Sequence, residues 1–492
     1  MELRQAQLWR CTESNMNSFS RGEHSMALQE GQRLERGIGL FQATATNMSQ
    51  MMGAGPFITV PIILSAMGGP QAIFGWMVGA LLAALDGLVW SELGAAMPGE
   101  GGTYVYLREA FQYRTGKLMP FLFVWSTLIV TPLIMSTGAI GLTQYLAYFF
   151  PHMTGLESKL VAVLVTIITM VLLWRRITSI ARLTTVLWIG AILTVVMVIV
   201  AASIHFNAHL AFSFPPNAFA PSKFLLGLGS GMLISIYDYM GYYTASYLGD
   251  EVSNPGKTIP RAILLSILFV AIIYLCMNIG MIGNIPWQAA MKSTDIGTQL
   301  VENVWGRPGA IVITLLIIWT CFASVYTGLL GASRLPYNAA RDGLFFKSFA
   351  NLHPRLKFPY VGLLVMGMIM AICCFFNLTE IINALMAMAI VIQFMGQIVA
   401  LTILRKRQPN LKRPFRQWLY PIPSILAFVG WAYVFYSSGW AAIRLAIAWT
   451  SLGIIAFLVW AYRKREWPFG QKVIQEAYLV QHMESVEQLS VD

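Results

Sequence analysis

Long apolar runs recur along the whole of this sequence, and they limit the folds open to it more than any other feature does. Two examples are Val186–Ile204 and Leu264–Ile282, each close to the roughly 20 residues that cross a bilayer core as a helix. Because the hydrocarbon core holds no water, each run must satisfy its own backbone hydrogen bonds and is expected to be helical. Only 11% of the 492 residues are charged, against about 25% in soluble domains. These features exclude an ordinary soluble fold and predict an all-α membrane protein.

Charged residues, prolines and glycines divide the apolar runs into twelve expected transmembrane helices. An even number places both ends of the chain on the same side of the membrane, which agrees with the charge pattern described next. The expected spans are 38–64, 72–97, 118–149, 157–174, 180–204, 224–248, 260–285, 308–335, 360–378, 382–404, 419–438 and 441–462.

Lysine and arginine residues gather in alternate loops between these spans, in a chain whose net charge is +11. One set of loops holds clusters such as Arg405–Arg407 and Arg463–Arg465, whereas the intervening loops hold isolated residues such as Lys159, Lys223 and Lys292. Basic loops mark the cytoplasmic side. Both termini are therefore expected in the cytoplasm, with the protein in a plasma or bacterial inner membrane. The basic charge is explained without a nucleic-acid partner.

The predicted organisation is one transporter domain between two tails. Residues 1–37 form a cytoplasmic N-terminal tail, 38–462 the twelve-helix domain, and 463–492 a cytoplasmic C-terminal tail. The five cysteines and six histidines show no metal-ligand spacing. We therefore expect no metal, no cofactor and no enzymatic activity.

Two of the expected helices contain residues that interrupt a helix in the middle of the membrane. The first carries Gly53–Pro56, and the sixth carries the polar segment Tyr237–Tyr242. Glycine permits unwound backbone, and proline lacks the amide that continues a helix. The interruptions lie five helices apart, which predicts two repeats of opposite orientation, about 38–204 and 224–404, followed by two further helices at about 419–462. Paired broken helices point to a transporter's binding site, although glycine clusters also serve close helix packing.

Four segments carry motifs of a known transporter family. Gly53–Gly55 forms a Gly-small-Gly motif, Ser91–Tyr104 joins an acidic helix end to a Gly-Gly loop, and Gly249–Ile263 contains Asp-Glu-x-x-Asn-Pro followed by Pro-x-Ala-Ile. With helix eight at Cys321–Leu335, these motifs resemble the amino acid–polyamine–organocation (APC) superfamily, most closely its L-type amino acid transporter branch. The resemblance implies a five-plus-five inverted repeat with two further helices and transport by alternating access.

The resemblance further implies a substrate site built mainly from backbone groups at the two breaks. Amides around Ala54 and Gly55 would hold a substrate carboxylate, and carbonyls near Met51, Tyr237 and Met240 would receive its ammonium. A helix that restarts after a break does offer free amides and a positive dipole end to an anion. Tyr237 stands where the family has an aromatic gate over the solute. The residues expected to line the site are Met51, Gly53, Ala54, Gly55, Tyr237, Asp238, Met240, Gly241 and Tyr242.

Two acids, Asp86 and Asp238, fall within expected membrane spans. An acid at the bilayer centre costs about 2.5–3.5 kcal/mol on insertion scales, so it is usually retained for a role. In the functional interpretation, each acid accepts a proton or provides a counter-charge for a cationic substrate. In the alternative interpretation, Asp86 is a hydrogen-bonded group that only holds helix packing, and Asp238 caps the freed amides of the break. Polyamine-transporting relatives in the superfamily tend to carry an acid at the position of Asp86. Ser324 in helix eight is a third candidate for ion coupling, the alternative being a hydroxyl bonded to its own helix.

Four charged residues lie at the cytoplasmic ends of expected helices: Glu92, Asp250, Glu251 and Arg334. They are candidates for an inner gate of salt bridges that break as the site opens inward. The alternative is that they are solvated charges at helix ends.

These observations predict a secondary active transporter that moves a neutral or cationic amino acid by alternating access, coupled to protons or by exchange. A carrier of polyamines or other organic cations is the main alternative, favoured by Asp86 and Asp238. A solute sensor without flux is a further alternative. The expected partners are a small amine-bearing solute, the lipid bilayer and protons.

Overall fold

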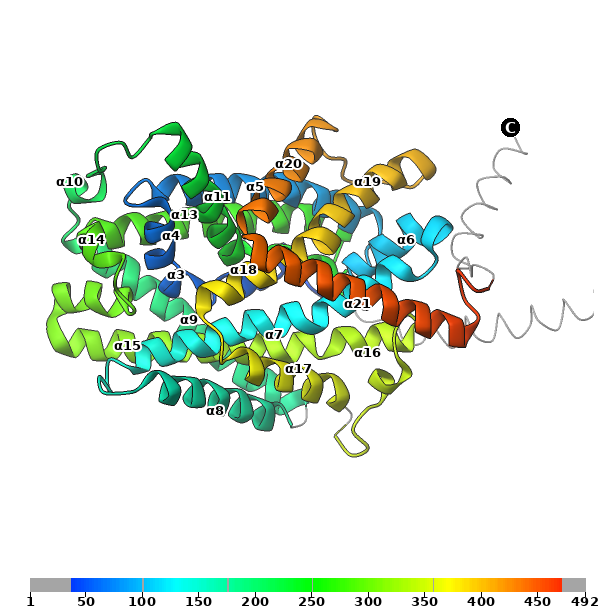
Figure 1. Ribbon diagram of the computed structural model, residues 1–492, viewed down its shortest axis with the longest axis horizontal. Coiled ribbons are helices and arrows are strands. Elements are labelled where there is room, and N and C mark those ends of the chain that lie inside the picture. The colour runs from blue at the N-terminus through cyan, green and yellow to red at the C-terminus, as the bar shows by residue number, and fades with distance from the viewer. Residues whose placement is uncertain (1–36, 100, 175–176, 250, 357, 471–492) are drawn as a thin grey trace, which may run out of the picture.

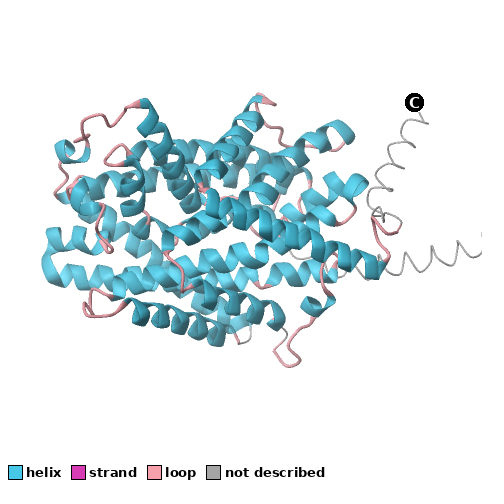
Figure 2. Cartoon of the chain, viewed as in Figure 1, coloured by secondary structure: helices cyan, strands magenta, loops and turns pink. Residues whose placement is uncertain are grey.

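The computed structural model describes residues 37–99, 101–174, 177–249, 251–356 and 358–470, with the backbone alone for 177–185. Most of the two predicted tails, as well as Asp250, lie outside these ranges. Within them the chain is helical, and helices joined by loops account for the fold in Figure 2. The one β-type contact recorded for this part of the chain is a parallel bridge between Ile38 and Val252.

The helices follow one another along the chain with short connections (Figure 1). In chain order they are α2 Leu40–Met51, α3 Gly55–Ile58, α4 Val60–Met67, α5 Ala72–Ala96, α6 Thr103–Thr115, α7 Leu118–Leu146, α8 Gly155–Leu173, α9 Ile177–Ile204, α10 Ala208–Ala211, α11 Pro221–Tyr239, α12 Thr244–Tyr247, α13 Pro255–Ile282, α14 Trp287–Ala290, α15 Ile296–Ala332, α16 Arg334–Arg341, the 3-10 helix η1 Lys347–Ala350, α17 Tyr360–Cys373, α18 Leu378–Ala389, the π-helix η2 Ile390–Met395, α19 Gly396–Arg407, α20 Ile422–Ser437 and α21 Trp440–Lys464.

Eight segments of the described chain are long and apolar enough to cross a membrane, which makes this a multi-pass membrane protein. They are Ala72–Ala96, Leu118–Leu146, Gly155–Leu173, Val186–Ile204, Pro255–Ile282, Ile296–Arg341, Leu378–Arg407 and Trp440–Lys464. The pair Leu40–Ile58 and Val60–Met67 adds a ninth when it is taken as one span, bent by 61°. Tyr360–Cys373 and Ile422–Ser437 are shorter apolar helices.

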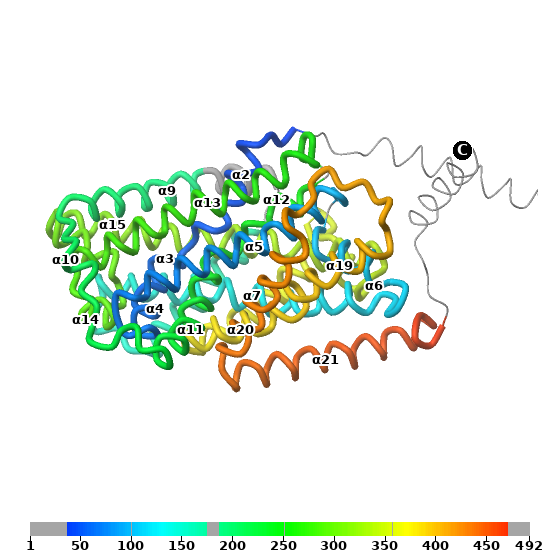
Figure 3. Tube along the Cα trace, turned by 90° about the horizontal axis from the view of Figure 1, so that it is seen from above, coloured from blue at the N-terminus to red at the C-terminus, as the bar shows by residue number. Residues whose placement is uncertain are grey.

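Helices at the periphery expose apolar side chains, as expected for contact with lipid. Along α8 the exposed residues recur every three or four positions and so lie on one face: they are Leu156, Leu160, Leu164, Ile167 and Val171. The last helix, α21, lies along the outside of the bundle in both views (Figures 1 and 3). In contrast, α7, α5 and α13 bury about half of their apolar length inside the bundle.

Small residues allow α5 and α11 to pack with their backbones in close contact. Gly75 and Gly79 are one turn apart on α5, and they lie against Gly231 and Ser235 on α11. The Ser235 hydroxyl donates a hydrogen bond to the Gly75 carbonyl at 2.9 Å. Small residues spaced by four are a common device for helix association in membranes. This contact fixes α11 against α5 and thereby positions the second break described below.

The close α5–α11 contact predicts that a single methyl group at Gly79 destabilises the protein. A Cβ there would lie 2.1 Å from Ser235 Oγ and 3.1 Å from its Cβ. Overpacking of this kind typically costs about 1–3 kcal/mol. We expect Gly79→Ala to lower the melting temperature of the purified protein, measured by tryptophan fluorescence in detergent.

Gly331→Ala is the matched control, because Gly331 also lies within a helix but no atom lies within 4 Å of its added Cβ. Its melting temperature should stay the same or rise, since alanine favours helix by roughly 1 kcal/mol over glycine. Equal melting temperatures for the two variants would contradict the packing argument.

Candidate functional site

Helix one is interrupted where its glycines lie. Helix α2 ends at Met51, residues 52–54 are not helical, and α3 begins at Gly55. The amide of Gly53 turns back to the Met51 carbonyl at 2.9 Å. Among the described residues, the amides of Ala54 and Gly55 have no hydrogen-bond acceptor. Two donors and the positive end of a helix are therefore available at this break.

Helix six is interrupted too, slightly later than the sequence suggests. Helix α11 continues through Tyr237 and Asp238 to Tyr239, the chain turns at 240–243, and α12 begins at Thr244. Gly241 adopts a φ of +111°, a conformation that side chains with a Cβ rarely take. Tyr237 and Asp238 thus belong to the last turn of α11, whereas Met240, Gly241 and Tyr242 form the unwound segment.

The two breaks lie against each other. A Cβ on Gly241 would lie 2.8 Å from the Gln50 Cβ and 3.3 Å from the Met51 amide. A Cβ on Gly55 would lie 1.9 Å from Asp238 Oδ1. Because glycines from both helices contact the opposite helix, the free backbone groups of both breaks belong to one site.

A tyrosine from α13 links the carbonyl ends of the two broken helices. The Tyr274 hydroxyl donates to the Met51 carbonyl at 2.5 Å and lies 3.5 Å from the Asp238 carbonyl. The Tyr274 side chain is fully buried, and its ring packs edge-on against Trp76. The Tyr274 hydroxyl therefore bonds to the Met51 carbonyl, one of the groups predicted to accept a hydrogen bond from a substrate ammonium.

Two further helices complete the surroundings of the breaks. The Tyr237 hydroxyl lies 2.5 Å from Thr137 Oγ1 on α7, so the predicted aromatic gate is held by that helix. Ser324 on α15 lies close to Gly53, whose added Cβ would be 3.2 Å from the serine Cβ. The Ser324 hydroxyl donates to the Cys321 carbonyl at 2.9 Å, as the alternative interpretation of this residue expects.

Asp238 is buried against α3 and α4, with only 3% of its surface exposed. Its Oδ2 lies 2.6 Å from Thr59 Oγ1, and the same hydroxyl lies 2.9 Å from the Gly55 carbonyl. Oδ1 has no hydrogen-bond partner within the described residues. A hydroxyl carries one proton, so both contacts of Thr59 are hydrogen bonds only when Asp238 contributes a proton of its own.

Asp86 on α5 contacts helix six at a different point. Its Oδ2 accepts hydrogen bonds from the Trp90 indole at 2.9 Å and from the Tyr242 hydroxyl at 2.5 Å. Trp90 stacks on Tyr243 with ring centroids 4.2 Å apart. Asp86 is therefore joined to the unwound turn of helix six, but it belongs to an aromatic cluster rather than to the group around Gly55.

Of the four charged residues predicted as an inner gate, the three that the structure describes form no ion pair with one another. Glu92 is completely buried, and its carboxylate pairs with Arg405 at 2.5 Å and Arg413 at 3.4 Å, two residues that were not predicted for the gate. Burial lowers the pKa of the Arg413 guanidinium, an effect that the nearby Glu92 opposes. Arg334 is exposed and Glu251 partly buried, without an ion pair among the described residues. Asp250 lies outside the described residues.

Three residues of the site carry no motif of their own: Thr59, Thr137 and Tyr274. Each is a hydroxyl-bearing residue in an apolar stretch of the sequence, and many such residues along this chain bond only to their own backbone, as Thr44 does to Leu40. Residue type alone does not distinguish the hydroxyls that bond across the bundle from those that bond only to their own backbone. No group of His, Cys, Asp and Glu side chains in the described part of the chain has the arrangement of a metal site.

The chain is thus a helical membrane protein in which two broken helices contact each other. Residues 38–462 match the family model described as amino acid permease. The chain therefore belongs to the amino acid permease family of the APC superfamily, as the sequence motifs predicted.

Similar proteins include several named amino acid transporters. The chain is 25% identical to the branched-chain amino acid permease BcaP of Bacillus subtilis, over 87% of this chain and 93% of that protein. It is 26% identical to the serine/threonine exchanger SteT of Bacillus subtilis, over 83% of this chain and 92% of that protein. It is 27% identical to the mouse large neutral amino acids transporter small subunit 2, over 86% of this chain and 81% of that protein.

The contact between Thr59 and Asp238 predicts a specific loss of transport. Thr59→Val keeps the shape of the side chain but removes the hydroxyl, and a buried polar group left without its partner costs about 1–3 kcal/mol. We expect the rate of amino acid uptake by reconstituted Thr59→Val protein to fall by about tenfold or more.

Thr44→Val is the control, because Thr44 is also buried in helix one but its hydroxyl contacts only the Leu40 carbonyl. Its uptake should stay close to that of the unaltered protein. A similar loss in both variants, or in neither, would show that the Thr59 contact has no special role.

Proposed function

We propose that this chain is a secondary active transporter for a neutral or cationic amino acid. Twelve spans, arranged as two inverted five-helix repeats with two further helices, would place both termini in the cytoplasm and the paired breaks at the centre of a cell membrane. The transporter works by alternating access. The observation that supports this most is that the amides of Ala54 and Gly55 are free at the place where the two breaks contact each other.

The backbone at this location suits a zwitterion. Two amides at the beginning of α3 offer hydrogen bonds and a positive dipole end to a carboxylate. Carbonyl groups at the ends of α2 and α11 offer acceptors and a negative dipole end to an ammonium. An amino acid presents both groups on adjacent atoms, so it can satisfy both ends of the site at once. The names of the relatives, which refer to branched-chain amino acids, serine and threonine, and large neutral amino acids, favour the same substrate class.

Asp238 is the residue to which we assign proton coupling. The groups around it are the hydroxyl of Thr59 and the side chains of Tyr237, Tyr239 and Tyr274, and no lysine, arginine or histidine forms an ion pair with it within the described residues. An ionised Asp238 beside Gly55 would repel a substrate carboxylate at the same helix end. Protonation of Asp238 removes that repulsion, so binding of a proton and of the substrate would favour each other.

At the cytoplasmic end, we assign closure to Glu92 with Arg405 and Arg413. This cluster joins the end of α5 to the end of α19 and to the loop after it. Breaking it would leave a buried carboxylate without partners, which makes it a strong closing contact.

A carrier of polyamines or other organic cations is the second candidate function. It is favoured by the two buried acids, Asp86 and Asp238, and by the aromatic rings that surround Asp86, since aromatic faces attract cations. Such a substrate would leave the amides of Ala54 and Gly55 without an acceptor.

Competition between analogues tests the proposed substrate class. In proteoliposomes that contain the purified protein, unlabelled leucine should inhibit uptake of labelled leucine, whereas leucinol, which lacks the carboxylate, should compete at least about tenfold less well. The loss follows from the two amide donors that leucinol leaves without a charged acceptor. Strong inhibition by putrescine and none by amino acids would support the organic-cation alternative. Saturable leucine binding without uptake would identify a sensor.

The role of Asp238 predicts how uptake depends on pH. An inward proton gradient should stimulate uptake by the unaltered protein, because external protons load Asp238 together with the substrate. Asp238→Asn mimics the protonated state, so this variant should exchange internal for external amino acid but should not respond to the gradient.

Asp86→Asn is the companion variant, since it alters a buried acid outside the group around Gly55. An inward proton gradient should still stimulate uptake by this variant. If both variants respond to the gradient as the unaltered protein does, proton coupling through these acids is wrong.

A further inference from the structure

A cavity lies apart from the two breaks, on the side of the bundle opposite the basic loops. It has a volume of about 310 Å³ and is lined by α7, the beginning of α8, the loop before α15, and the segment that joins α17 to α18. This volume falls at the lower end of the range of small-molecule pockets, roughly 300–1,000 Å³. The cavity is therefore large enough for a small solute.

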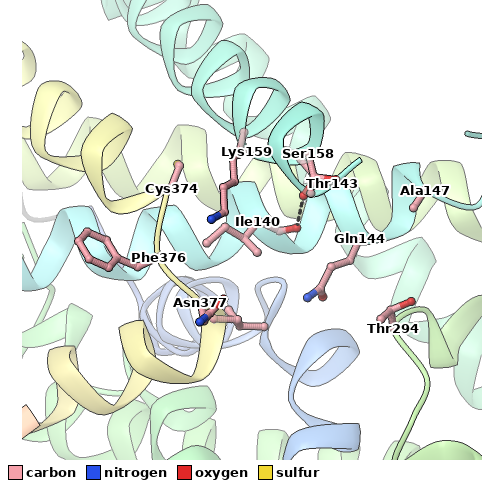
Figure 4. Close-up of a pocket in the computed structure, with 13 residues that line it drawn as sticks. Ile140, Thr143, Gln144, Ala147, Ser158, Lys159, Thr294, Cys374, Phe376 and Asn377 are labelled. Atoms are coloured by element: carbon pink, nitrogen blue, oxygen red, sulfur yellow. Dashed lines mark hydrogen bonds between the residues drawn. The ribbon is translucent and has the colours of Figure 1, made fainter. Parts of the chain in front are cut away.

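Polar side chains from three of these elements point into the same space. Figure 4 shows the side chains of Lys159 of α8, Gln144 of α7 and Asn377 before α18 around this cavity. The side chains of Lys159, Gln144 and Ser158 form no hydrogen bond or ion pair among the described residues. An ammonium, an amide and a hydroxyl are thus available to a ligand.

The charge of the cavity favours an anion. Lys159 is the one charged residue in its lining, and no acidic residue lines it within the described chain. Two acids adjacent in sequence to lining residues, Glu157 and Asp295, bond to other groups. Glu157 accepts from the Thr154 amide at 2.7 Å, and Asp295 accepts from Gln299 at 3.0 Å. The N-termini of α8 and α18 lie at the same place, but each is capped by an acid of its own first turn, Glu157 and Glu380, so Lys159 is the main source of attraction for an anion.

Apolar residues cover the rest of the lining. Ile140, Phe376 and Leu378 offer a surface to an aliphatic group next to the cation. We propose that this cavity is an outer binding site for a small solute that combines a carboxylate with an aliphatic chain, the carboxylate pairing with Lys159 and hydrogen bonding to Gln144 and Asn377.

Helix α7 separates this outer site from the central one. Gln144 and Ile140 line the cavity, whereas Gly138, on a neighbouring face of α7, packs close to Ser324 at the breaks. A ligand in the outer site would therefore contact the helix that holds the predicted gate residue Tyr237 through Thr137. The site does not require an ammonium on its ligand, which distinguishes it from the central site.

The probe for the test is 4-methylpentanoate, a carboxylate with a branched chain and no amino group. The full chain is reconstituted in phosphatidylcholine nanodiscs, and the labelling rate of each lysine by an amine-reactive reagent is measured by mass spectrometry. At ten times its dissociation constant, the probe leaves about one site in eleven free, so labelling of Lys159 should slow about tenfold. Lys223 and Lys292 are exposed lysines of the same side and should be unaffected.

Variants separate this site from the central one and from general anion binding. Lys159→Gln should abolish the heat of 4-methylpentanoate binding in calorimetry, whereas Lys223→Gln and Asp238→Asn should retain it. The neutral amide 4-methylpentanamide should not protect Lys159.

Three results would overturn the proposal: no protection of Lys159, equal protection of all three lysines, or protection by phosphatidylglycerol in the nanodisc but not by 4-methylpentanoate. The last result would identify the occupant as a lipid headgroup. Failure of leucine uptake with Lys159 protection intact would count against the central transport site alone.

Discussion

A backbone group in a bilayer must find a hydrogen-bond partner within the protein, and the rest of this structure is arranged around two places where the helix does not supply one. At 52–54 and at 240–243 the helical ladder stops inside an otherwise apolar bundle. Hydrocarbon would not tolerate these interruptions if each faced lipid alone. The two breaks instead lie against each other, and glycines at both allow the contact. The freed groups are thereby shielded from lipid and available to a polar solute.

Side chains from neighbouring helices satisfy only part of this exposed backbone. Tyr274 takes up the Met51 carbonyl, and Thr59 joins the Gly55 carbonyl to Asp238. The carbonyls are thus partly occupied, whereas the amides of Ala54 and Gly55 are not. If the proposed function holds, this asymmetry leaves free the amides that would receive a substrate carboxylate, and it would favour a substrate that carries an anionic group.

The membrane class, the family and the position of the first break could be predicted from the sequence, because each depends on local chemistry. The length of the apolar runs indicates helices that span a bilayer, and Gly53 and Gly55 indicate unwound backbone. The second break was placed a few residues too early, because Tyr237 and Asp238 looked out of place in a membrane helix. In the structure their side chains bond to Thr137 and Thr59 across the bundle while their backbone remains helical.

Partnerships across the bundle were the part that the sequence could not supply. Glu92 was expected with other residues at cytoplasmic helix ends, but its partners Arg405 and Arg413 lie more than 300 positions later. Several basic residues were available in the same set of loops, and only the packing of α19 against α6 and α5 selects these two. The outer cavity could not be predicted for a similar reason. From the sequence Lys159 is an isolated charge in a loop, because only the fold brings Gln144 and Asn377 to the same cavity.

The glycine contact between α5 and α11 has a mechanical consequence. Gly75 lies against the Gly231 backbone and Gly79 against the small Ser235 side chain, so few flexible side chains are available here to repack if one helix slides along the other. We expect the two helices to move as one rigid unit. The hydrogen bond from Tyr242 to Asp86 and the stacking of Tyr243 on Trp90 would carry the turn at 240–243 along with that unit.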